Sequence, residues 1–377
     1  MWELLFLLLP IAAFSGWFFG RRRLTANRGI EKLLGLSDFL SRRPEKSAEA
    51  FIEWLDANQE SVETHLTLGN LFRRRGEVDK AISIHQNLIT KSSLTQEQRA
   101  LSLLELSRDY MRAGVLDRAE NVLKELVNKG LELETSFLHL IDIYQQSKEW
   151  LRAIETAEKL EQATHRDMSR HIAHFYCELA EQLWLKGERE AADTYLKRAL
   201  EVNPKCVRVS ILTGDIAANA GDYKVAIKAY QQVQKQDQAF LSEIVVPLAR
   251  CYESLGNPEG LVKYLTHCLE TSPNLSVVLA FSDWLYKTHG EEEAVKFVVE
   301  HLQVHPSIRG LSRLMQFTLA RAEGAIREDL TILQELMDKV VAHKPLYRCQ
   351  ACGYSGRTLQ WQCPGCKRWD VIQPIHE

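Results

Sequence analysis

The sequence predicts an all-α fold of stacked helix pairs, an α-solenoid, with an apolar segment before it and a small cysteine-rich module after it. The composition supports helices: Gly (19) and Pro (10) are few for 377 residues, of which 45% are hydrophobic, and this balance disfavours sandwiches and barrels. A repeat along the chain and four cysteines near its end supply the other two observations. With 47 Lys+Arg against 50 Asp+Glu, the overall charge does not indicate nucleic acid as a partner.

The first twenty residues, MWELLFLLLPIAAFSGWFFG, contain one charged side chain, Glu3. As a helix they would be about 30 Å long, close to the thickness of the hydrocarbon core, so residues 1–20 are predicted to be a transmembrane anchor. Three arginines follow at 21–23, whereas a cleaved signal peptide carries its positive charge in front of the apolar segment. Because basic residues stay in the cytoplasm, we expect a basic linker at 21–28 and the bulk of the chain on the cytoplasmic side. A cleaved signal peptide is the alternative.

Repeated helix pairs are predicted for residues 29–344. In VETHLTLGNLFRRRGEVDKAISIHQNLI, small and aromatic residues have the spacing of a tetratricopeptide repeat. Small residues let two helices approach closely, and a glycine ends the first helix. Residues 30–55 read as a degenerate first repeat, and 308–344 as helices without the signature, as at the end of a solenoid. The glycines and alanines that mark the frame are Gly69, Gly76, Ala81, Gly114, Ala119, Ala153, Gly187, Ala192, Ala199, Gly214, Gly221, Ala226, Gly256, Gly290 and Ala294.

A stack of such repeats has a concave face that usually holds another protein. The frame of the first helix in each repeat predicts which polar or aromatic residues face this groove. Arginines gather in the first two repeats and acidic residues further along, which predicts a polarised groove. For any single residue, a solvated helix face is the alternative. The predicted groove residues are Asn70, Arg73, Arg74, Arg108, Arg112, Asp142, Gln145, Glu181, Trp184, Asp215, Arg250, Glu253 and Trp284.

No catalytic motif stands out, and the chain is not expected to be an enzyme. The sequence lacks GxSxG, GxxxxGK[ST] and HExxH. The nearest approach to a histidine cluster, at His165, His171 and His174, is expected to be solvated at the entry to a helix hairpin. Four cysteines without a shared spacing are expected to pack as small apolar side chains: Cys177, Cys206, Cys251 and Cys268.

The remaining four cysteines form the pairs Cys349-x2-Cys352 and Cys363-x2-Cys366. Two turns of this kind can place four sulfurs around one metal ion at about 2.3 Å. Two disulfides are the alternative, which a cytoplasmic location disfavours. Because the protein would supply all four ligands, the metal would be structural zinc or an iron ion that carries one electron. A nucleic-acid ribbon is disfavoured because few basic residues surround the site.

The module at residues 345–377 is too small to fold on apolar burial alone, and metal ligation worth about 10–16 kcal/mol can hold it folded. Gly353 and Gly365 are expected to adopt positive φ angles that turn backbone N–H groups toward the sulfurs. Aromatic side chains at Tyr354, Trp361 and Trp369 are available to cover the site and to pack on the helices before it. We therefore expect a metal-folded lid docked on the last helices.

The segments CQACGYSG and CPGCKRW resemble the two metal knuckles of rubredoxin. Together with the apolar N-terminus and the repeats, and above all with ETHLTLGNLFRRRGEVDKAISIHQNLI, they make the whole chain resemble the lipopolysaccharide assembly protein B family of Gram-negative bacteria. One departure is Lys367, because a rubredoxin knuckle usually has glycine after its last cysteine. The metal ligands that the resemblance implies are Cys349, Cys352, Cys363 and Cys366.

This resemblance implies a non-enzymatic adaptor of the bacterial inner membrane. Its partners would be the UDP-acyl-N-acetylglucosamine deacetylase of lipid A synthesis, a membrane-anchored AAA+ protease that degrades this deacetylase, and a lipopolysaccharide-sensing membrane regulator that opposes the degradation. A general scaffold for envelope assembly and a redox partner with iron at the four cysteines are the alternatives. The sequence leaves iron or zinc open and is compatible with a homo-oligomer.

Overall fold

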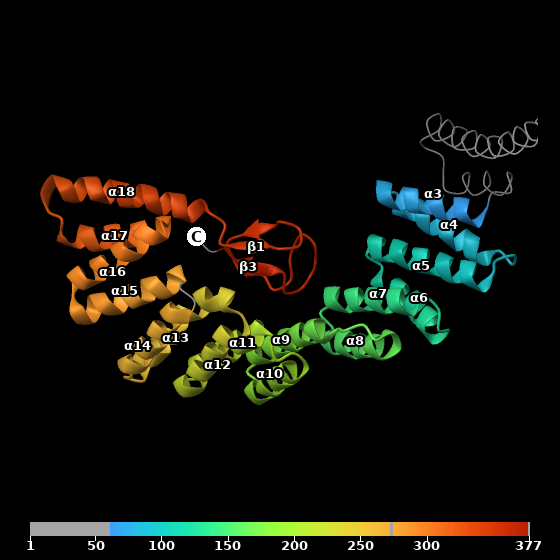
Figure 1. The fold of residues 1–377 in the computed structure, drawn as a ribbon. Helices are drawn as coiled ribbons and strands as arrows, with labels where there is room; N and C mark the ends of the chain where they lie inside the picture. The colour runs from blue at the N-terminus through green and yellow to red at the C-terminus, as the bar shows by residue number, and fades with distance from the viewer. Residues whose placement is uncertain (1–60, 272–273, 376–377) are drawn as a thin grey trace, which may run out of the picture. The chain divides into compact units, whose positions relative to one another are not determined.

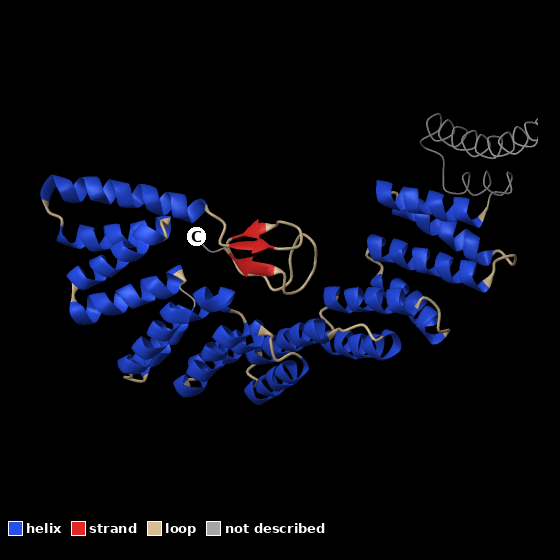
Figure 2. Ribbon diagram, in the orientation of Figure 1, coloured by secondary structure: helices blue, strands red, loops and turns tan. Residues whose placement is uncertain are grey.

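The computed structural model describes residues 61–271 and 274–375. These residues form helices up to His343 and a small three-stranded sheet after it (Figures 1 and 2). The predicted anchor, linker and degenerate first repeat, at 1–55, lie outside the described residues. Among the helices that are described, none has the length and apolar character needed to cross a membrane. The chain divides into two compact units, Met1–Glu132 and Leu133–Glu377, called units 1 and 2.

The described part of unit 1 contains two helix pairs. They are α3 (Val62–Arg75) with α4 (Val78–Thr90), and α5 (Gln96–Ala113) with α6 (Leu116–Asn128). Side chains cap the first helix of each pair, because Ser61 accepts a hydrogen bond from the Thr64 N–H and Thr95 forms a capping box with Gln98. Gly76 ends α3 at a φ of 84°, in the left-handed region that favours glycine. The predicted repeat frame therefore matches the helix boundaries here.

Unit 2 continues with helix pairs and ends in the sheet. In Figure 1 the helices follow one another from α7 (green) to α18 (orange) before the strands. They are α7 (Leu133–Gln146), α8 (Trp150–Thr164), α9 (Ser169–Leu185), α10 (Arg189–Val202), α11 (Val207–Asn219), α12 (Tyr223–Gln236), η1 (Gln238–Phe240), α13 (Leu241–Ser254), α14 (Pro258–Thr271), α15 (Leu275–His289), α16 (Glu291–Val304), α17 (Ile308–Arg321) and α18 (Gly324–His343).

Small residues lie where paired helices are closest, as the repeat frame predicts. A Cβ atom added at Gly214 on α11 would lie 2.4 Å from the ring of Tyr230 on α12. The four cysteines without a shared spacing are all buried, which confirms that they pack as small apolar side chains. The alanines of the frame are fully buried at Ala81, Ala119, Ala153, Ala192, Ala226 and Ala294.

Gly214→Ala is expected to destabilise the chain by about 1–3 kcal/mol, because the new methyl group displaces a closely packed ring. The displaced Tyr230 hydroxyl would also lose its hydrogen bond to Asp215, at 2.7 Å. Chemical denaturation followed by circular dichroism measures the change. The half-buried Thr213→Ala on the same helix is the matched control, with an effect below about 0.5 kcal/mol. Equal midpoints for Gly214→Ala and the native chain would contradict the close approach.

Candidate metal centre and its docking on the repeats

The C-terminal sheet presents two cysteine-bearing turns. Strands β1 (Tyr347–Cys349), β2 (Ser355–Gly356) and β3 (Ile372–Pro374) are antiparallel in the order β2-β1-β3. Cys349 is the last residue of β1, and Cys352 lies in the turn from β1 to β2. The loop between β2 and β3 carries the second pair, and a bridge between Gln362 and Trp369 closes it. The two turns thus bring four cysteines that are close in sequence to one end of the sheet.

The four sulfurs have the separations of a tetrahedral metal site. Cys349 Sγ lies 3.8 Å from Cys366 Sγ, and Cys352 Sγ lies 3.6 Å from Cys363 Sγ. All four sulfurs are within 4.8 Å of one another. Metal–sulfur bonds of 2.3 Å in a tetrahedron place sulfurs about 3.8 Å apart, whereas a disulfide needs about 2.05 Å. The residues present therefore fit one metal ion, and the disulfide alternative does not match the structure.

The backbone of the two knuckles is nearly the same. Gly353 and Lys367 each follow the second cysteine of a pair and have φ angles of 77° and 58°. Their N–H groups donate to the carbonyls of Cys349 and Cys363, at 3.0 and 2.8 Å. The expectation of a positive φ angle at Gly365 is therefore wrong. Lys367 adopts the positive φ angle instead, and its Cβ atom makes this left-handed conformation less favourable than it would be for glycine.

Gly365 has a different role, which is close approach to the sulfurs. A Cβ atom added there would lie 3.4 Å from Cys352 Sγ and 3.8 Å from Cys363 Sγ. These are ordinary van der Waals distances, so a methyl group would fit against the sulfurs, whereas a longer side chain would have to point away from them.

Backbone donors stabilise thiolates at the site. Burial raises the pKa of Cys349, but hydrogen bonds from the N–H groups of Cys352 and Ala351 outweigh it and lower this pKa to about 6. The Tyr354 N–H lowers the pKa of Cys352, but burial and the neighbouring thiols raise it to about 11. A bound metal would deprotonate the remaining thiols and hold the two turns together. Because all four ligands come from the protein, the site has no open position of the kind that catalytic zinc uses.

Two tryptophans of the module pack on the repeats. Trp369 is buried and stacks on His174 of α9, with ring centroids 5.1 Å apart, and contacts Phe175 edge to face at 5.9 Å. Trp361 stacks on Phe240 of η1 at 5.5 Å. We expected the module to dock on the last helices, which is wrong: these rings contact elements that lie more than a hundred residues before it in the sequence. The chain doubles back, so the module packs on the middle of unit 2.

Polar contacts fix the position of the module. The Trp369 Nε1–H donates to Gln145 Oε1 at 2.7 Å, and the Gln362 amide donates to the same oxygen at 3.3 Å. The Tyr347 hydroxyl donates to Glu243 Oε2 of α13 at 2.9 Å. Gln145, which the repeat frame assigns to the partner groove, therefore holds the chain's own module.

Arg208 on α11 is a contact residue that the sequence interpretation missed. It is 3% exposed, and its Nη2 donates to Glu178 and Glu181 of α9 at 2.8 and 2.7 Å. The guanidinium group also lies 5.9 Å from the ring centroids of both Trp361 and Trp369. The sequence feature that could have indicated this role is the position of Arg208 between two valines in VRVSIL, because a buried charge is costly unless it is paired. Glu181, another predicted groove residue, serves as one of its counter-ions.

His174 is fully buried, so the expectation that it is solvated is wrong, although His165 is exposed as expected. Burial and the nearby charge of Arg208 hold the pKa of His174 well below its usual value. The carboxylate of Asp370, 3.9 Å from His174 Nε2, faces it from the module. The apolar run IAHFYC around this histidine is the signal that could have predicted its burial. His174 therefore packs as a neutral ring.

In unit 1, part of the predicted basic groove is an internal network. Arg73 Nη1 donates to Asp109 at 2.8 Å and Arg73 Nη2 to Glu105 at 2.6 Å, while Asn70 accepts from the same guanidinium at 2.6 Å. Arg108 donates to Glu105 at 2.6 Å. These arginines neutralise buried carboxylates, so reversing their charge would disturb the fold. The exposed predicted residues of this unit are Arg74 and Arg112.

The predicted groove residues of unit 2 have several different surroundings. Asp142 accepts weakly from Gln145, at 3.4 Å, and Asp215 accepts from Tyr230. Trp184 is half-buried on α9. Three residues line one cavity between α13 and α15: Arg250, Glu253 and Trp284. The structure therefore brings together only part of the predicted set, and which of these residues contact a partner stays a prediction.

Comparisons with known proteins agree with this architecture. A family described as "Rubredoxin metal binding domain" matches residues 347–374, and tetratricopeptide repeat families match 64–100 and 177–239. Lipopolysaccharide assembly protein B of Escherichia coli strain K12 is 39% identical over 100% of this chain and 98% of its own length. The protein of that name from Haemophilus influenzae Rd is 35% identical with the same coverage. A solved tetratricopeptide repeat protein from Parabacteroides merdae is 15% identical over 68% of this chain and 98% of its own, with a TM-score of 0.33, too low to support an argument.

Replacing two ligands, with Cys363→Ser plus Cys366→Ser, is expected to abolish metal binding and to unfold the module, because two thiolates cannot close the tetrahedron. Elemental analysis gives the metal content per chain, and limited proteolysis should cut the variant beyond about residue 345. Cys251→Ala plus Cys268→Ala removes two thiols elsewhere and should keep the metal. Native metal content in the serine variant would refute the assigned ligands.

His174 is expected to make the chain less stable in mild acid. Its folded-state pKa lies below the unfolded value of about 6.5, so as the pH falls through that value the unfolded chain binds a proton that the native chain does not. His174→Phe keeps an aromatic ring on Trp369 and should lower the slope of unfolding free energy against pH by up to about 1.4 kcal/mol per unit between pH 6.5 and 5. Denaturation at a series of pH values measures this slope. An unchanged slope, equal to that of the exposed control His165→Gln, would contradict the neutral buried state.

Proposed function

The chain belongs to the lipopolysaccharide assembly protein B family, and we propose that it is a non-enzymatic adaptor in lipopolysaccharide assembly. In this proposal it is tethered to the bacterial inner membrane by residues 1–20, with its bulk in the cytoplasm. It presents the deacetylase of lipid A synthesis to a membrane-anchored AAA+ protease, and a lipopolysaccharide-sensing membrane regulator opposes this step.

The observation that carries the proposal is the docking of the module on the repeats. A metal with four protein thiolates lacks an exchangeable position for substrate, so the site is suited to building a surface. The module adds its own side chains to the repeats: Trp369 packs on α9, Trp361 packs on η1, and both rings lie beside Arg208 of α11. Such a surface can bind a protein without making or breaking a bond.

A membrane tether makes an adaptor more effective. Confining two binding partners to one bilayer raises their effective concentration to about the millimolar range. The adaptor then needs only modest affinity for its client. Exposed basic residues at Arg74 and Arg112 of unit 1 are candidates for contacts with a partner, because they are not used in the internal network.

A redox partner that uses iron at the four thiolates is the second candidate. One observation favours it: Cys352 is exposed and Cys366 is half-buried, so one edge of the site is open to solvent and to electron transfer. Replacing the native metal with zinc separates the two roles, because zinc fills the same tetrahedron but carries no electron. Full activity of the zinc-loaded chain in cells or extracts would support the adaptor and exclude the redox role.

Deleting the chain is expected to lengthen the half-life of the deacetylase in cells, because the protease would lose its adaptor. The half-life is followed by immunoblotting after protein synthesis is stopped. Re-expressing the full chain should restore rapid turnover, whereas a chain that starts after residue 20 should not, since it lacks the proposed tether. The Arg74→Glu plus Arg112→Glu variant then tests the basic face of unit 1. A half-life that does not change on deletion would exclude the adaptor role and leave a general scaffold for envelope assembly.

A further inference from the structure

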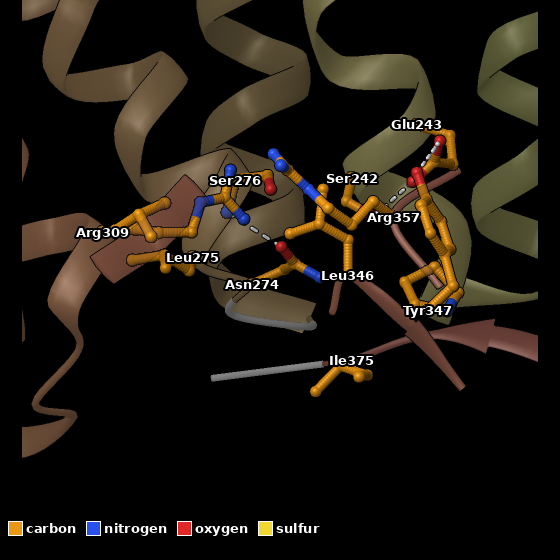
Figure 3. A pocket seen from close by; sticks show the side chains of 12 residues that line it. Ser242, Glu243, Asn274, Leu275, Ser276, Arg309, Leu346, Tyr347, Arg357 and Ile375 are labelled. Carbon is orange, nitrogen blue, oxygen red and sulfur yellow. Dashed lines mark hydrogen bonds between the residues drawn. The ribbon is translucent and has the colours of Figure 1, made fainter. Parts of the chain in front are cut away.

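Unit 2 contains a groove beside the module that the metal site does not use. It consists of two cavities that share Ser242, Ser276 and Arg309 in their walls. The first, of about 350 Å³, lies where α13, α15 and α17 begin and is bounded by the module (Figure 3). The second, of about 460 Å³, extends along α13 and α15. The shared residues make the two cavities direct neighbours, and together they are called the α13–α17 groove below.

The first cavity gathers positive charge. Arg309 of α17 and Arg357 of the module line it, and Figure 3 shows their side chains extending into it from opposite sides toward Ser276. Glu243, also in its wall, accepts from the Tyr347 hydroxyl at 2.9 Å and remains a negative charge, which the two arginines outnumber. Arg357 is exposed and forms no ion pair with the residues that the structure describes. Two guanidinium groups directed into one space favour an anion there, and a carboxylate suits their planar donors.

The second cavity is mainly apolar. Val246 of α13, Leu279 of α15 and Trp284 of α15 line it, and Val246 is 55% exposed although it faces this space. At its rim Lys287 donates to Glu253 at 2.8 Å, so these two charges neutralise each other. An apolar hollow with a paired rim favours a bulky aliphatic or aromatic side chain.

We propose that the α13–α17 groove binds the C-terminal end of a peptide. The terminal carboxylate lies between Arg309 and Arg357, and an apolar side chain next to it enters the cavity lined by Trp284. A chain terminus fits better than an internal acidic residue, because Leu346 and Tyr347 of the module line only the first cavity and bound the groove at that end. This inference rests on the proposed adaptor function, since the peptide would belong to a client protein.

A peptide array tests the groove with the metal-loaded full chain. The array presents short peptides with every combination of the last two residues, once with a free C-terminal carboxylate and once with a C-terminal amide. We expect binding to members that end in bulky apolar residues, and about tenfold weaker binding to their amides, because each lost charge-assisted hydrogen bond is costly. Arg357→Gln should weaken binding to the free acids by a similar factor and leave binding to the amides unchanged.

Two further variants separate the parts of the groove. Val246→Ser should weaken binding of the peptides with apolar ends, while Arg348→Gln, an exposed change on β1 outside the groove, should leave all binding as in the native chain. Equal binding of acids and amides, or absence of binding to the acids, would overturn the inference. If acids and amides bind equally and inorganic phosphate competes with them, the first cavity binds a phosphate group instead. That outcome would also overturn the inference.

The peptide array and the half-life measurement test the peptide inference and the adaptor role separately. An array without preference for the carboxylate overturns the peptide inference even where deletion of the chain stabilises the deacetylase. Conversely, an unchanged half-life overturns the adaptor role whatever the array shows. The Arg357→Gln variant, expressed in cells, links the peptide inference to the adaptor role. Slower turnover of the deacetylase in this variant is expected only if both are correct.

Discussion

The gathering of four cysteine sulfurs within 4.8 Å of one another, a set that fits one metal ion, is the constraint on which the position of the module in unit 2 depends. The buried apolar cluster inside the module consists of Cys349, Cys363 and Ile372, too little to keep a segment of this size folded without a metal. Only a folded module places Trp361 and Trp369 where they can stack on α9 and η1. The first cavity of the α13–α17 groove depends on the folded module as well, because the module supplies one of its walls.

The module uses part of the surface that a partner would be expected to use. Gln145 and Glu181, assigned from the repeat frame to partner contacts, instead hold Trp369 and pair with Arg208. The buried guanidinium of Arg208 is tolerated because two carboxylates and two aromatic rings surround it. Helices α7, α9 and α11 therefore contact the chain's own module, and these contacts do not involve the exposed residues of unit 1 or the α13–α17 groove.

Local features could be predicted from the sequence, whereas contacts between distant segments could not. The ligands and the helix pairs follow from short spacings, such as Cys363-x2-Cys366 or Gly76 before Ala81, because neighbouring residues determine them. The stacking of Trp369 on His174 joins residues nearly two hundred positions apart, and no local pattern specifies it. Lys367 shows a subtler limit: its left-handed backbone follows from the knuckle geometry, which overrides the preference of its residue type. The sequence also assigns Arg73 to a partner groove, although Arg73 forms ion pairs with Asp109 and Glu105 of α5.

The central claim is that metal ligation positions the module on the middle repeats. Hydrogen–deuterium exchange on the full chain, compared before and after removal of the metal with a chelator, tests it most directly. We expect faster exchange on metal removal in the module and also in α9, η1 and the start of α13, which lose their contacts with Trp369, Trp361 and Tyr347. Exchange that increases only beyond residue 345, with α9 and α13 unchanged, would contradict the claim.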